Sequence, residues 1–157
     1  MTVFVSTHVA MGVLIGQNVP TPGVAFALGV ASHFMLDLIP HGDTQLYVNY
    51  KEGQAVKKSL IYVAVDSVLA IIIFIYLLET APYASRGTMV AGVIGGICPD
   101  FLVALGEGVK IRPLLWFQRL HMRIHNAIAS RVGNIPLGTG ICMQLVVLAI
   151  MIFIVKR

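Results

Sequence analysis

Long apolar runs alternate with short polar segments along this chain. The runs are long enough, or nearly so, to cross about 30 Å of hydrocarbon as helices. They predict five membrane spans, at about 2–17, 23–39, 58–78, 87–106 and 137–155. The stretch from Asn18 to Gly23 is rich in Asn, Pro and Gly and predicts a turn. The first two spans therefore form a tight hairpin, and because both are short we expect helix tilt or local bilayer thinning.

The polar segment between the fourth and fifth spans has a helical periodicity of its own, from about 113 to 132. Apolar residues recur there at helical spacing and arginines mark another face. The apolar positions are Leu114, Leu115, Phe117, Leu120, Ile124, Ile128 and Val132, and the arginines are Arg119, Arg123 and Arg131. This pattern is typical of a helix lying in the membrane interface. We therefore predict an all-α integral membrane protein, a single membrane domain over 1–157 with a compact bundle of about five transmembrane helices plus this amphipathic helix.

Composition supports a membrane protein and excludes a soluble globular domain. The chain has 157 residues, of which 57% are hydrophobic and 11% charged, and its mean hydropathy is +0.86. Soluble domains average about 45–50% apolar and about 25% charged residues. So few charges also give no reason to expect a nucleic-acid partner. Cys98 and Cys142 lie in apolar runs without C-x-x-C spacing, so no disulfide framework or zinc ribbon is expected.

The distribution of lysine and arginine predicts the orientation. On one side of the predicted spans lie Lys51, Lys57, Lys58, Lys110, Arg112, Arg119, Arg123 and Arg131, and on the other only Arg86, Lys156 and Arg157. Positive residues near span ends are enriched in the cytoplasm. An odd number of spans then places the N-terminus and the amphipathic helix inside and the C-terminus outside. We expect a bacterial or archaeal cytoplasmic (inner) membrane.

Histidines and acids gather in a few short strings rather than being scattered. Ionisable groups within the membrane are costly, by about 2.5–3.5 kcal/mol for an Asp at a helix centre, and are rare unless paired, hydrated or functional. In the predicted topology, four spans place such groups near one level at the cytoplasmic side, below two histidines of the amphipathic helix. These groups are His8, His33, Asp37, Asp66, Asp100, His121 and His125. Convergence at one depth predicts one site.

Helical spacing gives this site the chemistry of a metal centre. His33 and Asp37 are four residues apart and project from one helix face, and His121 and His125 repeat that spacing. Mixed imidazole and carboxylate ligands suit divalent metals, and we expect one or two ions, zinc or manganese. The candidate ligands are His8, His33, Asp37, His41, Asp100, His121 and His125; Asp66 and Asp43 are candidate catalytic acids or bases, and Arg119 and Arg123 could hold a substrate phosphate.

Each group also has a structural alternative. His8 could be a hydrogen-bonded packing residue, and His33 with Asp37 could stabilise a helix end. His41 and Asp43 lie in a Pro-His-Gly-Asp sequence with ordinary turn chemistry. Asp66 could pair with an arginine, Asp100 could mark a helix break or cap after Pro99, and His121 with His125 could bind lipid headgroups. Two other function classes also stay open: a transporter of protons or metal ions, in which a homodimer would complete the pathway, and a structural or regulatory membrane subunit whose helices a metal locks.

At these strings the chain resembles the YdjM-like family of membrane-bound metal-dependent hydrolases. Thr7-His8 with Gly12 and Gly16 is similar to the family's opening motif, and the run from Gly95 to Pro99-Asp100 is similar to its Gly-rich segment. His121 with His125-Asn126 is similar to its paired histidines. The resemblance implies metal ligation by His8, Asp100, His121 and His125. The family continues from Pro-Asp into a second Asp and a His; here Phe101-Leu102-Val103 follows, and we infer that His33, Asp37, His41 and Asp43 supply the missing groups.

The resemblance implies a membrane-bound hydrolase, and the position of the site suggests its substrate class. A site at the cytoplasmic leaflet favours a phosphoester or lipid-linked substrate, with membrane lipid as partner. The H-x-x-x-D spacing of His33 and Asp37 is also similar to a helical motif of zinc-dependent phospholipases C. Serine hydrolase chemistry is not favoured, because the chain has no G-x-S-x-G sequence.

Overall fold

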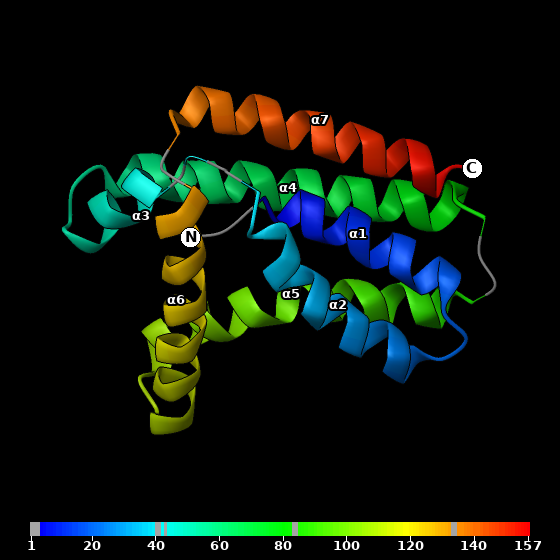
Figure 1. The fold of residues 1–157 in the computed structure, drawn as a ribbon, viewed down its shortest axis with the longest axis horizontal. Helices are drawn as coiled ribbons and strands as arrows, with labels where there is room; N and C mark the ends of the chain where they lie inside the picture. Colours follow the sequence, from blue (N-terminus) through cyan, green and yellow to red (C-terminus); the bar gives the residue numbers. More distant parts are fainter. Residues whose placement is uncertain (1–3, 40–41, 43, 83–84, 133–134) are drawn as a thin grey trace.

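The computed structural model of the chain describes residues 4–39, 42, 44–82, 85–132 and 135–157, with the backbone alone described at 44–47 and 128–132. The described secondary structure is helical throughout, which confirms the all-α prediction (Figure 1). The helices are α1 (Val5–Asn18), α2 (Pro22–Leu36), α3 (Thr44–Lys51), α4 (Val56–Thr80), α5 (Arg86–Val109), α6 (Arg112–Val132) and α7 (Leu137–Val155).

Three of these helices are long and apolar enough to cross a membrane, namely α4, α5 and α7. By contrast, α1 has 14 residues and α2 has 15, so at 1.5 Å a residue each is about 21–23 Å long and shorter than a bilayer core. The predicted count of five spans is therefore not confirmed. The predicted turn between α1 and α2 is present: Val19 is extended, Thr21 caps α2 through a bond from the Val24 amide, and Pro22 is the first helical residue.

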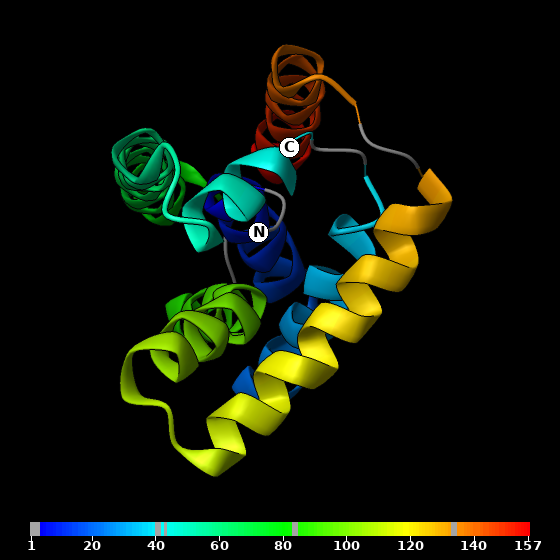
Figure 2. The same cartoon turned by 90° about the vertical axis from the view of Figure 1, so that its left-hand side faces the viewer.

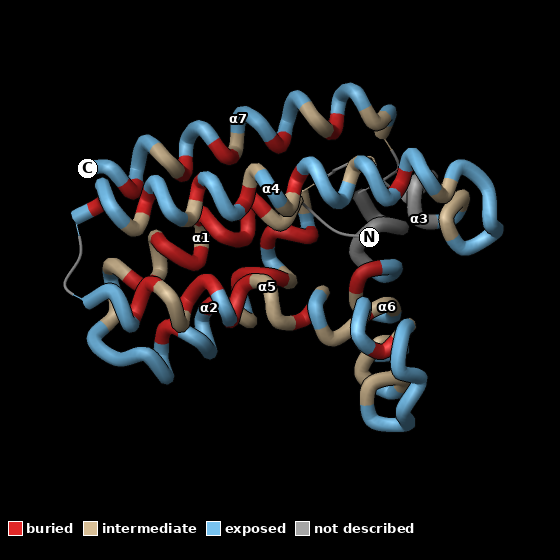
Figure 3. Tube along the Cα trace, turned by 180° about the vertical axis from the view of Figure 1, so that it is seen from behind, coloured by how far each residue is buried: buried red, intermediate tan, exposed pale blue. Residues whose placement is uncertain are grey.

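Helix α1 is the centre of the bundle and packs against α5, α4, α7 and α2. Figure 3 shows it as the most continuously buried helix, while α4 and α7 present long exposed faces. Those exposed faces are apolar, with Val65, Ile71 and Ile75 on α4 and Val146 and Phe153 on α7. A soluble monomer rarely exposes so extended an apolar surface. The surface fits a lipid environment, in agreement with the three helices that are long and apolar enough to cross a membrane.

Glycines permit the close packing of α1 on α5. A Cβ atom added to Gly12 would lie 2.6 Å from the backbone of Val93, and one added to Gly92 would collide with the carbonyl of Gly12. On α2, a Cβ atom added to Gly29 would likewise collide with the backbone of α5, at the carbonyl of Gly92. Small residues allow such approach between membrane helices, and it brings α1, α2 and α5 together at the level of their polar side chains.

The predicted amphipathic helix is confirmed, with bounds Arg112–Val132. Helix α6 crosses the end of the bundle where α1 begins, while α7 ends at the opposite end (Figures 1 and 2). It packs against α5. Leu114, Phe117 and Ile124 are half-buried, whereas Arg119 and Arg123 are exposed. A helix in this position covers the polar side chains at the start of α1.

Candidate metal centre

Five side chains from four helices converge beneath α6. His8 lies on α1 and His33 on α2, which Asp37 caps at its C-terminal end. Asp100 lies on α5 and His121 on α6. The three histidines are at most 1% exposed and Asp37 is 3% exposed, while the Asp100 side chain is 24% exposed. Polar groups buried to this degree are costly unless they are bonded to each other or to a ligand. Of the seven residues predicted to lie near one level, these five form the donor groups described below.

The donor atoms are spaced as ligands of a metal ion would be. Nε2 of His8 lies 3.7 Å from Oδ1 of Asp37, and Nε2 of His33 lies 3.6 Å from Oδ2 of Asp37. Oδ1 of Asp100 lies 3.6 Å from Nε2 of both His33 and His121. These separations exceed hydrogen-bond lengths of about 2.7–3.2 Å. They approach the distance of about 3.3–3.6 Å between neighbouring ligands of a tetrahedral ion with bonds of about 2.0–2.2 Å.

His33 is oriented by the backbone of α5. Its Nδ1 lies 2.9 Å from the carbonyl oxygen of Gly96, and because a carbonyl can only accept, Nδ1 carries the proton. The lone pair is then on Nε2, which faces the two carboxylates and makes no hydrogen bond among the described residues. Metal-binding histidines are commonly held in this way by a bond from the second ring nitrogen.

The donors form two groups that share His33. One consists of His8, His33 and Asp37, and the other of His33, Asp100 and His121; within each group the donor atoms lie within 4.8 Å of one another. Nε2 of His33 has a single lone pair and can bind one ion only. The two groups therefore make one centre, suited to one ion or to two ions that share carboxylate ligands.

His121 is neutral near pH 7, as a metal ligand must be. Burial lowers its pKa from 6.5 to about 4, and the nearby His33 acts in the same direction while Asp100 opposes the shift. Its ring lies 5.4 Å from that of His33 between centroids, and Phe34 and Phe117 flank it at 5.6 and 6.2 Å. These aromatic rings give the centre an apolar wall on the α6 side.

His125 lies one turn farther along α6 and is 4% exposed. Its ring is 6.5 Å from that of His121 between centroids, and it belongs to neither donor group. Its place as a ligand stays a prediction. His41 and Asp43 lie outside the described residues, so the ligand and catalytic roles predicted for them also stay predictions.

Asp66 is used differently from the other acids. Its Oδ2 accepts a 2.6 Å bond from the Val5 amide, and its Oδ1 accepts from the Ser6 hydroxyl at 2.6 Å and the Ser6 amide at 3.4 Å. Phe4 supplies no side-chain cap to α1, so Asp66 reaches across from α4 to supply one. A carboxylate suits the positive end of a helix. It fixes the start of α1 and thereby the helix that carries His8; the predicted catalytic role stays a prediction.

The phosphate-binding role of Arg119 and Arg123 stays a prediction, and neither residue belongs to the described lining of the cavity beside the centre. Both side chains are exposed, and each lies two residues from His121, a separation that places residues on different sides of a helix. Arg119 instead donates from Nε to the carbonyl of Leu115 at 3.2 Å.

Sequence reasoning missed two polar contributors. One is the Gly96 carbonyl, which no sequence pattern indicates because it is a backbone atom. The other is Gln144, fully buried on α7, whose side-chain oxygen accepts a 3.1 Å bond from the Thr7 hydroxyl. Gln144 is the one amide in the last apolar run, and that signal could have marked it. Its bond ties α7 to α1 one residue before His8.

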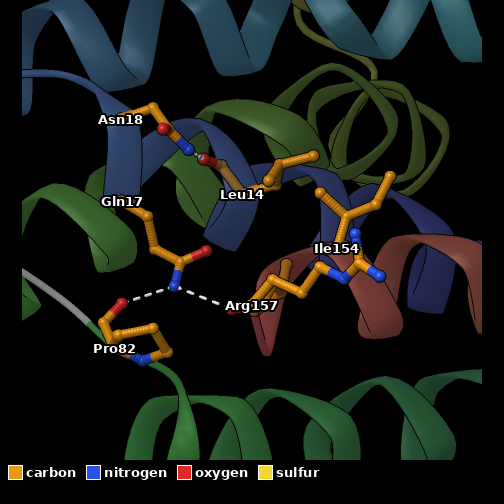
Figure 4. Close-up of a pocket in the computed structure, with 7 residues that line it drawn as sticks. Leu14, Gln17, Asn18, Pro82, Ile154 and Arg157 are labelled. Atoms are coloured by element: carbon orange, nitrogen blue, oxygen red, sulfur yellow. Dashed lines mark hydrogen bonds between the residues drawn. The ribbon is translucent and has the colours of Figure 1, made fainter.

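Among the described residues, cavities lie at both ends of the bundle, and the one beneath α6 touches the centre. A cavity of about 400 Å³ is lined by Asp100 and His121 together with residues of α1, α3 and α4. The other, of about 520 Å³, lies where α1 and α7 end (Figure 4). There Gln17 donates to the carbonyls of Pro82 and Val155. The larger cavity contains no histidine or carboxylate side chain among its lining residues.

No family model, curated protein or solved structure matches this chain. The resemblance to the YdjM-like family therefore rests on the short motifs around His8, Asp100 and His121. The fold brings those three residues into one centre through His33, which the resemblance did not include.

Proposed function

We propose that the protein is a membrane-bound metal-dependent hydrolase acting on a phosphoester or lipid-linked substrate at the membrane surface. The spacing of donor atoms around His33 carries this proposal. Three imidazoles and two carboxylates approach at 3.6–3.7 Å, and the Gly96 carbonyl holds His33 in the tautomer that a metal requires. The motifs shared with the YdjM-like hydrolases point to the same chemistry.

The donor set fits zinc or manganese, with one or two ions bound. A divalent ion supplies Lewis acidity, which lowers the pKa of a coordinated water towards about 7 and polarises a phosphoryl or carbonyl oxygen. The chain's own residues divide the remaining work. His8, His33, Asp37 and His121 are buried and hold the ion, whereas Asp100 is partly exposed and borders the cavity. His121 also borders the cavity, and Asp100 is the more exposed of these two ligands.

Asp66 lines the same cavity as Asp100 and His121 and is the candidate general base within the described residues. Its carboxylate oxygens accept hydrogen bonds from the Val5 amide and the Ser6 hydroxyl. The same bonds position α1, so Asp66 could serve as a positioning residue, as a general base, or as both. The Asp66→Asn variant, considered below, distinguishes them.

The membrane placement also belongs to the proposal. With α4, α5 and α7 as spans, α6 lies on the side where α1 begins. The excess of Lys and Arg on that side favours the cytoplasm. The centre then lies at the cytoplasmic leaflet of an inner membrane, where lipid phosphoesters are abundant.

The test is metal content followed by turnover. Protein purified in detergent is reconstituted with zinc or manganese and assayed by inductively coupled plasma mass spectrometry, beside a His33→Ala/His121→Ala double variant. We expect one or two ions per chain, lost in the variant, and metal-dependent release of phosphate from p-nitrophenyl phosphate or lysophosphatidic acid. A chain that retains no ion after reconstitution would overturn the proposal.

A metal that locks the helices is the second candidate. It is favoured by the burial of four of the five donors, which come from α1, α2 and α6. In that case chelation lowers the thermal midpoint of unfolding, and no phosphoester is turned over at any metal loading. The hydrolase instead shows metal-dependent turnover, whatever the effect of chelation on stability.

A further inference from the structure

The cavity beside the metal centre opens between α4 and α5. Both helices pack on α1, whereas they share few backbone contacts along their described lengths (Figure 2). The lining includes Leu60 and Val63 from α4 and Phe101 from α5, and these apolar side chains are 55%, 37% and 64% exposed. With α4 and α5 as membrane spans, an opening between them faces lipid rather than water.

The lining changes from polar to apolar across the cavity. Asp100 and His121 form the side next to the metal centre, while Leu60, Val63 and Phe101 line the opening. A volume of about 400 Å³ lies at the lower end of the range for small-molecule sites, about 300–1,000 Å³. It suits one alkyl or acyl chain. An amphiphile matches this arrangement when its head is at the metal and its chain points towards the bilayer.

The charges in the lining indicate how the head is held. The described lining contains no lysine or arginine. Its three acids are engaged: Asp66 with the start of α1, Glu107 with Lys51 at 2.5 Å, and Asp100 with His33 and His121. The cation beside the lining, Lys51, is paired with Glu107, so we assign the attraction for an anionic head to a bound divalent ion.

We propose that this cavity binds a single-chain anionic amphiphile, with its phosphate or phosphonate head at the metal centre and its chain between α4 and α5. The inference rests on the proposed function for the identity of the head's partner. The position of the alkyl chain rests independently on the apolar residues of α4 and α5 that line the cavity. The substrate thus enters sideways from the membrane, and affinity depends on chain length.

The experiment compares dodecylphosphonate with ethylphosphonate, which share a head that is not hydrolysed and differ in chain length. Each is titrated into zinc-loaded protein in phosphatidylcholine nanodiscs, with empty nanodiscs as the blank, and bound zinc is counted in the same samples. We expect dodecylphosphonate to bind at least about 10-fold more tightly, because its chain is buried in the cavity. Chelation should weaken the binding of both.

Two variants on α4 test the chain's position. Val63→Phe fills the cavity, while Val65→Phe makes the same change at a position 64% exposed and outside the lining. We expect Val63→Phe to reduce dodecylphosphonate affinity about 10-fold, to the level of ethylphosphonate, with zinc content unchanged. Val65→Phe should bind as the parent does. If Val63→Phe fails to fold, Ala104→Leu fills the cavity from α5.

The outcomes separate the two proposals. Zinc that is bound and lost in the His33→Ala/His121→Ala variant, together with equal affinity for the two phosphonates, overturns the amphiphile site alone. Equal dodecylphosphonate affinity in Val63→Phe and Val65→Phe does the same. A protein that holds no zinc overturns the metallohydrolase proposal. If its binding nevertheless depends on the length of the alkyl chain and is abolished by Val63→Phe, that result supports the apolar half of the amphiphile site.

Discussion

The two ends of the bundle both contain a cavity, yet their polar groups are used in opposite ways. At the end where α1 and α7 finish, Gln17 donates to the backbone carbonyls of Pro82 and Val155 and links the end of α1 to α7. At the end beneath α6, Nε2 of His33 and Nδ1 of His121 make no hydrogen bond among the described residues. The first cavity is the larger one. The two ends therefore differ in their polar atoms, which are hydrogen-bonded at Gln17 and lack a hydrogen bond at these histidine nitrogens.

The largest effect is expected from His33→Ala, which removes the donor shared by both groups. Metal affinity should fall by at least about 100-fold, equivalent to about 3 kcal/mol, and turnover should disappear with it. Competition with a zinc-selective chelator measures the affinity. His125→Ala is the matched comparison, since His125 is buried on α6 but belongs to neither group; it should lose less than about 10-fold. Equal losses in the two variants would place His125 among the ligands.

Gly12→Ala should disturb both ends together, because Gly12 lies midway along α1. The new Cβ atom would lie 2.6 Å from the backbone of Val93, so α1 and α5 must separate. We expect about 2–3 kcal/mol less free energy of unfolding and weaker metal binding, because α1 carries His8 and α5 carries Asp100. Thermal unfolding in detergent measures the first effect. Gly23→Ala is the control, because its Cβ atom meets nothing within 4 Å, and a similar loss there would contradict this explanation.

Asp66→Asn should reveal whether the carboxylate only caps α1. Losing its charge weakens three hydrogen bonds to Val5 and Ser6, so the free energy of unfolding should fall by about 1–2 kcal/mol. Metal content should be retained. Turnover that falls at least about 100-fold at full metal loading would support the general base. Unchanged stability, metal content and turnover would remove Asp66 from the mechanism.

The smallest effect is expected from Gln17→Ala at the opposite end. Two hydrogen bonds to backbone carbonyls are lost, at a cost of about 1 kcal/mol in unfolding free energy. Metal affinity and phosphonate binding should match the parent protein. A metal affinity reduced by about 10-fold or more would show that the two ends are coupled, and the contrast between them would no longer hold.

Much of the architecture could be predicted from local pattern. The amphipathic helix was expected at about 113–132 and is found at Arg112–Val132, because its apolar spacing is a property of the helix alone. The predicted count of five spans was not confirmed, because it depends on where each helix ends. The run at 23–39 reads as one apolar segment, but its helix ends at Leu36 and Asp37 caps it. Hydropathy records apolar side chains and does not record where a helix ends.

The sequence by itself determined the helical class, the interfacial helix, and the supply of histidines and acids from separate segments. Tertiary structure alone decided their roles. Asp66 and Asp100 are both acids in apolar helices, yet one caps α1 and the other faces two histidines. The reason is physical: helical periodicity depends on neighbours within a few residues, whereas donor distances of 3.6 Å depend on how closely α1, α2 and α5 pack at their glycines.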